Sequence, residues 1–241
     1  MTGTLHIVGL GPGDPDLMTV KAARTVGCAP VVAFFAKRGN AGHARTMVEG
    51  MMARDVEELR LNYPFTTEVP LHDPSYATGI AAFYDAAAER LAEPLAAGRD
   101  VALLCEGDPF FYGSSLALLD RLGGRFRTEV IPGVSGMSGC WTRAHLPMTH
   151  GDDVLSVLPG TLDAQDLARK LGSCDASVVM KLGRNLPKVA EAVRAAGLME
   201  RAVYVERGTM AGERVVPLRE MAGERAPYFS MVLIPGRQRS R

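Results

Sequence analysis

The sequence predicts an α/β protein of two α/β domains, the first with a mostly parallel sheet and the second with a mixed sheet. Short apolar runs alternate with helix-like stretches through most of the chain, and Gly or Pro occupies the joins. This alternation is typical of strand–helix–strand units, whose strands run parallel. The last three apolar runs follow one another without a helix pattern between them, which favours antiparallel or mixed pairing.

The first half opens with a strand at 5–9 that leads directly into a turn rich in Gly and Pro. The next stretch, 16–27, has apolar residues at helical spacing, and Asp14 or Asp16 is a suitable N-terminal cap. We expect Pro94 to bend or end a long alanine-rich helix. The remaining predicted elements are strand 31–35, helix 41–52, strand 56–61, loop 63–74, helix 75–97, strand 100–105 and helix 113–122.

A break at Gly123-Gly124 divides the chain into expected domains of residues 1–124 and 125–241. After the break, predicted strands and helices alternate again, and the chain ends with three predicted strands that have no helix between them. The predicted elements are strand 128–131, helix 135–145, strand 153–158, helix 163–172, strand 176–182, helix 186–196 and strands near 202–206, 213–217 and 228–234. Residues 236–241 have the composition of a basic, disordered tail.

Composition excludes several classes of protein. The 241 residues carry 27 Lys plus Arg and 27 Asp plus Glu, so there is no basic excess for a general nucleic-acid partner. No apolar run approaches the roughly 20 residues of a membrane helix. The histidines show no ligand spacing, and the cysteines lie far apart without a CxxC pair. We therefore expect a cytoplasmic protein with no bound metal, no disulfide framework and no membrane partner.

The neutral total conceals two unlike regions. Residues 61–120 contain nine acids and two bases, whereas residues 181–241 contain twelve bases and six acids. Such segregation can produce a local field on a neutral molecule.

A glycine-rich turn, Gly9-Leu-Gly-Pro-Gly-Asp-Pro15, joins the first strand to the first helix. It is not a dinucleotide fingerprint, because Asp14 stands where the third glycine is needed and Phe34 where an acid is needed. There is no P-loop sequence either. Two interpretations remain open, a tight structural turn and a ligand-binding loop.

Two further turns follow apolar strands. Glu106-Gly-Asp-Pro comes after strand 100–105, and the carboxyl ends of parallel strands are where α/β proteins bind ligands. The aromatic residues at 110–112 suit a flat or sulfonium-bearing ligand, although a capped turn with core aromatics would have the same sequence. The turn at 131–136 opens a helix at Ser135 and Gly136, and it lacks the nucleophile elbow of a hydrolase.

Taken in order, the three turns GLGPGDPDLMT, EGDPFFYGS and IPGVSGMSG resemble those of the cobalamin-pathway tetrapyrrole methyltransferases. The resemblance covers essentially the whole chain. Residues 34–40, 61–68 and 105–114 look most like the branch that methylates carbon C20 of precorrin-2 to give precorrin-3A. The chain departs from the uroporphyrinogen-III methyltransferases, which have Tyr-Asp where this chain has Phe34-Phe35 and a glycine where it has Glu106.

The resemblance implies a two-domain fold in which S-adenosylmethionine lies between the domains, with a tetrapyrrole substrate, a homodimer and no metal. Glu106 and Tyr112 are the candidate catalytic residues, with Asp14 as a rival to both. The implied cofactor contacts are Pro12, Glu106, Gly107, Asp108, Phe111, Ser135, Gly136, Leu182 and Gly208. The candidates for the carboxylated substrate are Asp14, Lys37, Arg38, Arg45 and Lys181, with Arg184 and Arg207 behind them.

Methyl transfer from a sulfonium needs no protein nucleophile, so alignment of the reactants is the main task. A base must still take the proton from the methylated carbon, and Glu106 is the acid that distinguishes its loop. The same reaction on the cobalt-bearing ring, a methylase for another ring position, a diphthine-type enzyme and a non-catalytic binding module remain alternatives. The bases near 37–45 and after 180 are expected to line the substrate site.

Overall fold

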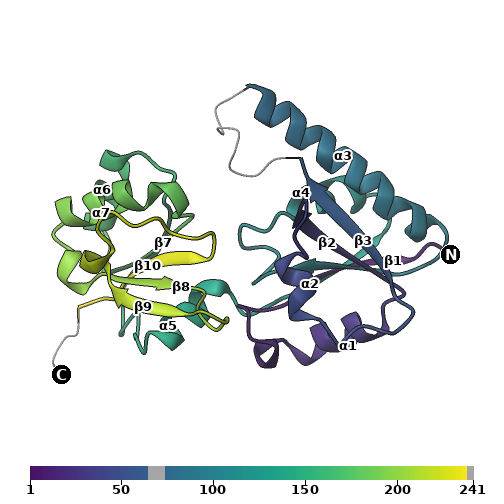
Figure 1. The fold of residues 1–241 in the computed structure, drawn as a ribbon, viewed down its shortest axis with the longest axis horizontal. Coiled ribbons are helices and arrows are strands. Elements are labelled where there is room, and N and C mark those ends of the chain that lie inside the picture. The colour runs from purple at the N-terminus through teal and green to yellow at the C-terminus, as the bar shows by residue number, and fades with distance from the viewer. Residues whose placement is uncertain (65–73, 238–241) are drawn as a thin grey trace. The chain divides into compact units, whose positions relative to one another are not determined.

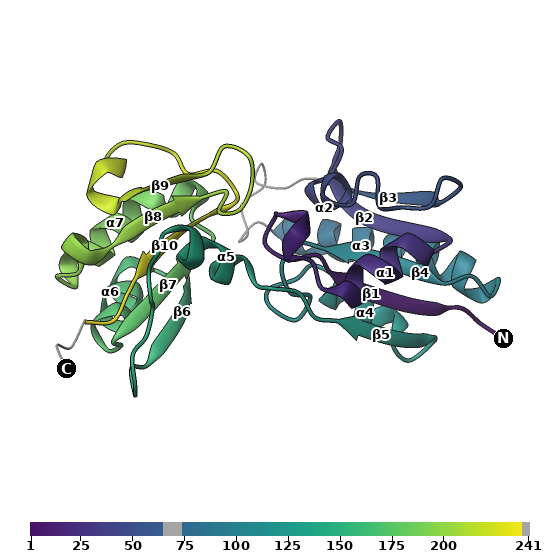
Figure 2. The same cartoon turned by 90° about the horizontal axis from the view of Figure 1, so that it is seen from below.

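The computed structural model describes residues 1–64 and 74–237, without the side chains of residues 74–76 (Figures 1 and 2). Most of the predicted loop 63–74 and the end of the predicted tail lie outside these residues. The chain forms two compact units, Met1–Ser135 and Gly136–Arg241. Among the described residues, no helix is long and apolar enough to cross a membrane.

The first unit contains a five-stranded sheet in which every pairing is parallel. Its order is β3-β2-β4-β1-β5. The strands are β1 (Thr4–Gly9), β2 (Val31–Lys37), β3 (Glu57–Tyr63), β4 (Val101–Cys105) and β5 (Arg127–Ile131). Fully buried β4 has no polar face, as expected for a strand covered on both sides.

Helices cover both faces of this sheet. α3 (Pro74–Ala96) and α4 (Leu116–Leu122) pack on the side chains of Leu5, Ile7 and Leu103. α1 (Val20–Cys28) and α2 (His43–Met47) pack on the opposite face. Side chains alternate between the two cores along each strand, because successive residues of a strand point to opposite faces.

The sheet order creates a switch point between β1 and β4. These strands are neighbours, but the chain leaves β1 towards β2 on one side and leaves β4 towards β5 on the other. The crevice outside the carboxyl ends of such a strand pair is the usual ligand site of open α/β sheets. The glycine-rich turn and the turn at Glu106 therefore both follow strands that end at this point.

Three details of the first unit differ from the sequence predictions. The predicted helix 16–27 is a 3₁₀ turn, η1 (Pro15–Leu17), followed by α1, which begins after Thr19. Asp14 caps only η1, and the Thr19 hydroxyl caps α1 by accepting the Ala22 N–H. The predicted helix 41–52 shortens to α2, which ends at Met47; turns follow it through Gly50, which has φ +83°.

Pro94 lies inside α3 and does not end the helix. The helix ends at Ala96, and Gly98 terminates it. Gly98 has φ +81°, and the Arg99 N–H donates to the Pro94 carbonyl across it, which is the pattern of a glycine C-cap. The domain boundary also moves. β5 pairs with β1, so the first unit extends to Ser135 rather than ending at residue 124.

The second unit contains the predicted mixed sheet, in the order β6-β7-β10-β8-β9. Only β6 and β7 run parallel. The strands are β6 (Leu155–Pro159), β7 (Ala176–Met180), β8 (Val203–Glu206), β9 (Arg214–Pro217) and β10 (Ser230–Ile234). As predicted, no α-helix separates the last three strands, although the 3₁₀ turn η4 (Leu218–Met221) lies between β9 and β10.

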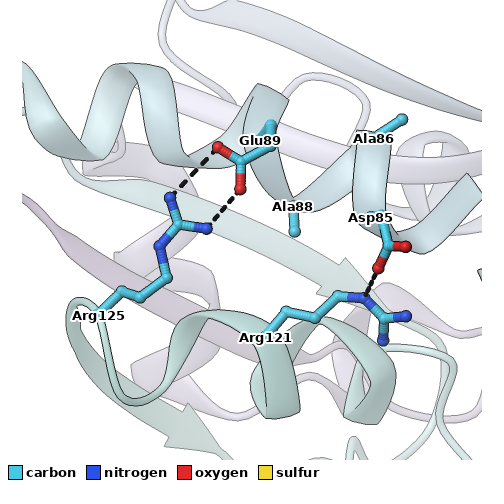
Figure 3. Close-up of a pocket in the computed structure, with 6 residues that line it drawn as sticks. All are labelled: Asp85, Ala86, Ala88, Glu89, Arg121 and Arg125. Carbon is cyan, nitrogen blue, oxygen red and sulfur yellow. Dashed lines mark hydrogen bonds and ion pairs between the residues drawn. The ribbon is translucent and has the colours of Figure 1, made fainter. Parts of the chain in front are cut away.

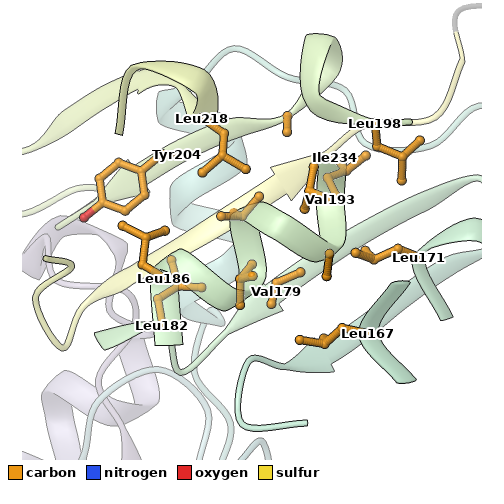
Figure 4. Packing of buried hydrophobic residues seen from close by; sticks show 14 of the residues in the cluster. Leu167, Leu171, Val179, Leu182, Leu186, Val193, Leu198, Tyr204, Leu218 and Ile234 are labelled. Atoms are coloured by element: carbon orange, nitrogen blue, oxygen red, sulfur yellow. The ribbon is translucent and has the colours of Figure 1, made fainter. Parts of the chain in front are cut away.

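Two cores stabilise this second sheet. α6 (Ala164–Gly172) and α7 (Leu186–Ala195) cover one face, where Leu167, Val193 and Tyr204 are completely buried (Figure 4). α5 (Gly136–Arg143) packs on the other face through Cys140. The remaining short turns are η2 (Gly183–Asn185) and η3 (Met199–Arg201).

Candidate functional site

The backbones at the carboxyl ends of β1, β4 and β5 come into close contact at Gly9, Gly107 and Gly133. A Cβ atom built on Gly133 would lie 2.1 Å from the Gly107 carbonyl oxygen and 2.9 Å from the carbonyl carbon of Gly9. A Cβ on Gly9 would lie 2.6 Å from the Gly133 nitrogen. No side chain fits between these three segments, so glycine is required at the contacts. The three sequence turns thus converge at the carboxyl ends of their strands.

Hydrogen bonds join the first two turns directly. Gly11 and Gly107 form an isolated antiparallel bridge, with the Gly107 N–H donating to the Gly11 carbonyl at 2.8 Å and the reverse bond at 3.3 Å. Gly107 has φ +66°, a conformation that favours glycine. The glycines of the first turn therefore do more than reverse the chain, because they dock on the loop after β4.

Asp108 links the loop after β4 to the loop after β5. Its Oδ2 accepts the Gly133 N–H at 3.1 Å, and its Oδ1 accepts the Phe110 N–H at 2.9 Å. The sequence analysis proposed this carboxylate as a cofactor contact. The structure shows that both of its oxygens already bind backbone donors of the protein.

Glu106 begins the loop after β4 and reaches towards α2. Its Oε1 accepts the Ala44 N–H at 3.2 Å. Although Glu106 is an exposed residue, the protein atoms around its carboxyl shield it from water and raise its pKa. The residue's own N–H, the charge of His43 and the Ala44 N–H act in the opposite direction. A carboxyl with a raised pKa is suited to accepting a proton.

The aromatic residues of this loop are presented to solvent. Phe110 is 60% exposed and Tyr112 is 48% exposed, while the ring of Phe111 packs edge-on against Tyr112 with centroids 5.0 Å apart. Tyr112 has φ +58°, which is strained for a bulky side chain. Strained residues of this kind concentrate at binding and catalytic sites. A flat or cationic ligand at these rings stays a prediction from the sequence.

The two candidates in the first turn differ in their surroundings. Pro12 is half-buried between Gly11 and Gly13, both of which have positive φ. Asp14 accepts the Asp16 N–H and so closes the η1 turn. Asp14 is thus a structural cap, in addition to any part it plays as a ligand or base.

The first unit separates the basic candidates into two groups. Lys37 ends β2 and is exposed together with Arg38. Arg45, in contrast, forms a forked pair with Glu58 at 2.9 and 3.1 Å and also contacts Glu49 at 3.2 Å. Its hydrogen bonds lower the pKa of Glu58. Arg45 is therefore engaged in tying α2 to β3, a role that the sequence did not indicate.

In the second unit, the candidate residues are placed by tight backbone geometry. Leu182 is fully buried, so its side chain belongs to the core. A Cβ on Gly208 would lie 2.7 Å from the Cys140 sulfur, which brings β8 close to α5. Lys181 and Arg207 are exposed and have φ +56° and +48°. Ser135 and Gly136 lie at the junction of the two units, and Arg184 is exposed in η2.

The sequence analysis missed one neighbour of the loop after β4. His43, interpreted only as a histidine without ligand spacing, begins α2 and acts electrostatically on Glu106. A signal for it would have required the tertiary contact between α2 and the loop. Elsewhere, an open hollow between α3 and α4 is lined by the pairs Arg121–Asp85 and Arg125–Glu89, whose charges neutralise each other (Figure 3).

The described residues contain no group of three or more His, Cys, Asp and Glu side chains arranged to hold a metal ion. The site instead offers a carboxyl, exposed aromatic rings and backbone groups at a switch point. These features suit a small organic ligand with a flat or cationic part.

Comparisons with known proteins agree with this assembly. The model of the family "Tetrapyrrole (Corrin/Porphyrin) Methylases" matches residues 4–222. A Sinorhizobium protein named precorrin-2 C(20)-methyltransferase is 55% identical over 97% of this chain and 96% of its own length. A Salmonella typhimurium protein named cobalt-precorrin-2 C(20)-methyltransferase is 27% identical over 97% of both chains.

A solved structure shares the fold. The uroporphyrin-III C-methyl transferase of Thermus thermophilus, crystallised with S-adenyl homocysteine, has a TM-score of 0.69 and 22% identity, covering 97% of this chain and 92% of that one. This likeness concerns the fold; the family is shown by the model that matches residues 4–222 and by the 55% identity to the Sinorhizobium protein. The chain belongs to the tetrapyrrole methylases.

Proposed function

We propose that the protein is an S-adenosylmethionine-dependent methyltransferase that methylates carbon C20 of precorrin-2 to give precorrin-3A in cobalamin biosynthesis. The observation that carries the proposal is the 55% identity, over nearly the whole of both chains, to the Sinorhizobium precorrin-2 C(20)-methyltransferase. The identity to the relative named for the cobalt-bearing substrate is 27%. That difference favours the metal-free ring as substrate.

The residues at the switch point fit S-adenosylmethionine. When bound, it supplies a methyl group as the carbon–sulfur bond breaks with its electrons moving to sulfur, and the ring carbon gains the methyl and loses a proton. Phe111 and Tyr112 offer ring faces to a sulfonium. The further proposed contacts with the cofactor are Pro12, Glu106, Gly107, Ser135 and Gly136. Leu182 would contact the cofactor through its backbone, because its side chain is buried in the core. Gly208, which has no side chain, would let the cofactor approach the backbone closely.

Glu106 is the proposed proton acceptor. Because the pKa of its carboxyl is raised, Glu106 gains a proton more readily than an ordinary glutamate. The hydrogen bond from the Ala44 N–H fixes the position of the carboxyl. Tyr112 remains the second candidate, because its strained backbone presents the side chain to solvent. No protein nucleophile is required, since holding the reactants in line can itself contribute about 7–11 kcal/mol.

The ring substrate carries many carboxylates, and exposed bases are needed to bind them. Lys37, Arg38 and Lys181 are exposed in the structure and remain our candidates. Arg45 is a weaker one, because Glu58 and Glu49 already neutralise it. Binding of a substrate carboxylate there would require exchange of an existing ion pair.

The test is an anaerobic incubation of the protein with S-adenosylmethionine and either precorrin-2 or cobalt-factor II, followed by mass spectrometry and NMR of the product. We expect the gain of one methyl group at C20 on the metal-free ring. Faster turnover of the cobalt-bearing ring would reassign the substrate. Binding of S-adenosylmethionine without any methylated product would support the non-catalytic binding module.

The proposal extends to a homodimer, as the family resemblance implies, and to a cytoplasmic location, as the scattered cysteines without a CxxC pair suggest. Sedimentation velocity at micromolar protein concentration tests the oligomeric state, and a monomer that retains full activity would remove the dimer from the proposal. Fractionation of the source cells tests the location.

A further inference from the structure

Asp108 connects two loops that both carry proposed cofactor contacts. The loop after β4 contains Gly107 and Phe111, and the loop after β5 leads to Ser135. The Asp108 side chain spans them, since one oxygen binds the Phe110 N–H within its own loop and the other binds the Gly133 N–H, 25 residues further along the chain.

The arrangement requires a carboxylate rather than an amide. Each Asp108 oxygen accepts a backbone N–H, and only an ionised carboxylate has two oxygens that accept without donating. An asparagine amide has one acceptor oxygen and one NH₂ group. Whichever way it turned, its NH₂ would face either the Phe110 N–H or the Gly133 N–H, so one loop contact would be lost.

The backbone around Asp108 leaves little space to absorb a change. Gly133 approaches both Gly107 and Gly9 so closely that a single Cβ would overlap them. Pro109, which follows Asp108, also lies against Gly9, with its Cδ 2.8 Å from the position of a Cβ there. A small displacement of either loop would therefore separate the contacts that hold the three strand ends together.

We propose that Asp108 is a positioning residue that holds the loop after β4 against the loop after β5 and thereby sets the spacing of the cofactor contacts on the two loops. The inference rests on the proposed function, because the contacts that it positions are those proposed for S-adenosylmethionine. It replaces the role of direct cofactor ligand that the sequence suggested for this residue.

A direct contact and a positioning role predict different patterns of loss. A carboxylate that binds one part of the cofactor affects only ligands that contain that part. A carboxylate that sets loop spacing weakens every ligand that uses both loops. S-Adenosylhomocysteine and 5′-methylthioadenosine distinguish a direct contact with the amino-acid portion from a positioning role, since the second ligand lacks that portion.

The first experiment measures hydrogen–deuterium exchange in the full-length, ligand-free protein. In Asp108→Ala, which removes both acceptor oxygens, the peptide that contains Gly133 and Val134 is expected to exchange faster than in the wild type; in Asp108→Asn, either this peptide or the one that contains Phe110 is expected to do so. Asp163→Asn is the matched control, because Asp163 also accepts a backbone N–H, that of Asp166 at 2.8 Å, but at the start of α6. Unchanged exchange at Gly133 in Asp108→Ala would overturn the proposal, whether or not the protein is a methyltransferase.

The second experiment measures affinity and kinetics on the same variants. We expect Asp108→Asn to weaken both ligands by the same factor, about tenfold, as for the loss of one charge-assisted hydrogen bond. KM for S-adenosylmethionine should rise while kcat at saturation stays within about threefold. A loss confined to S-adenosylhomocysteine would identify a direct contact and overturn the positioning role. If the wild type binds both ligands but does not methylate precorrin-2, only the proposed function fails.

Discussion

At the scale of single residues, Glu106 combines a backbone tether with a raised pKa. We predict that Glu106→Gln lowers kcat by about 10²–10⁴-fold, the usual contribution of a general base, with little change in the affinity for S-adenosylmethionine. Stopped-time assays and calorimetry measure the two quantities. Full turnover with unchanged affinity would move the proton acceptor to Tyr112 or Asp14.

The same substitution has a consequence for stability. Because the folded state raises the pKa of Glu106, ionisation of this group disfavours folding at pH values above its folded pKa, and the penalty is absent below the unfolded value of about 4.3. Glu106→Gln should therefore raise Tm at pH 8 and leave it unchanged near pH 4. Thermal scans at both pH values, with the exposed Glu191→Gln as control, test the sign. A lower Tm at pH 8 would contradict it.

Gly133 is the residue at which the backbone contact is closest. Gly133→Ala should destabilise the protein by about 1–3 kcal/mol, because the new methyl group would overlap the Gly107 carbonyl. Gly124→Ala is the control, since a Cβ there has no neighbour within 4 Å. Urea unfolding compares the two variants, and equal stability would show that the loops can separate without cost.

At the scale of elements, Thr19 rather than Asp14 begins α1. Thr19→Ala should cost about 1 kcal/mol through loss of the bond to the Ala22 N–H, whereas Thr19→Ser should retain most of it. The midpoint of chemical unfolding provides the measurement. A loss in Thr19→Ser as large as that in Thr19→Ala would assign the effect to the methyl group instead of the cap.

At the scale of the whole molecule, each hydrophobic core takes its residues from one unit only. A fragment of residues 1–135 contains the complete parallel sheet and should unfold cooperatively, as followed by circular dichroism. A fragment ending at residue 124 lacks β5 and should be less stable, because β1 would lose its edge partner. Equal midpoints for the two fragments would show that β5 is dispensable.

The sequence predicted the alternation of elements and both sheet types, because both depend on local pattern or on strand direction. The compact units divide at Ser135 and not at the Gly123-Gly124 break, because β5 joins β1 from more than a hundred residues away. Long-range partners also explain why the bonds of Asp108 to Gly133 and of Arg45 to Glu58 were not foreseen. Neither pair has a spacing in the sequence that indicates contact.

The strand order of the first sheet also bears on how the protein avoids aggregation. Its two edges are β3 and β5, whose outer backbone groups could recruit strands from other chains. β3 carries Glu57, Glu58 and Arg60, and β5 carries Arg127 and Glu129. A foreign strand that paired at either edge would have to bring its own side chains beside these charges. The charged side chains of the two edge strands therefore disfavour pairing with strands of other chains.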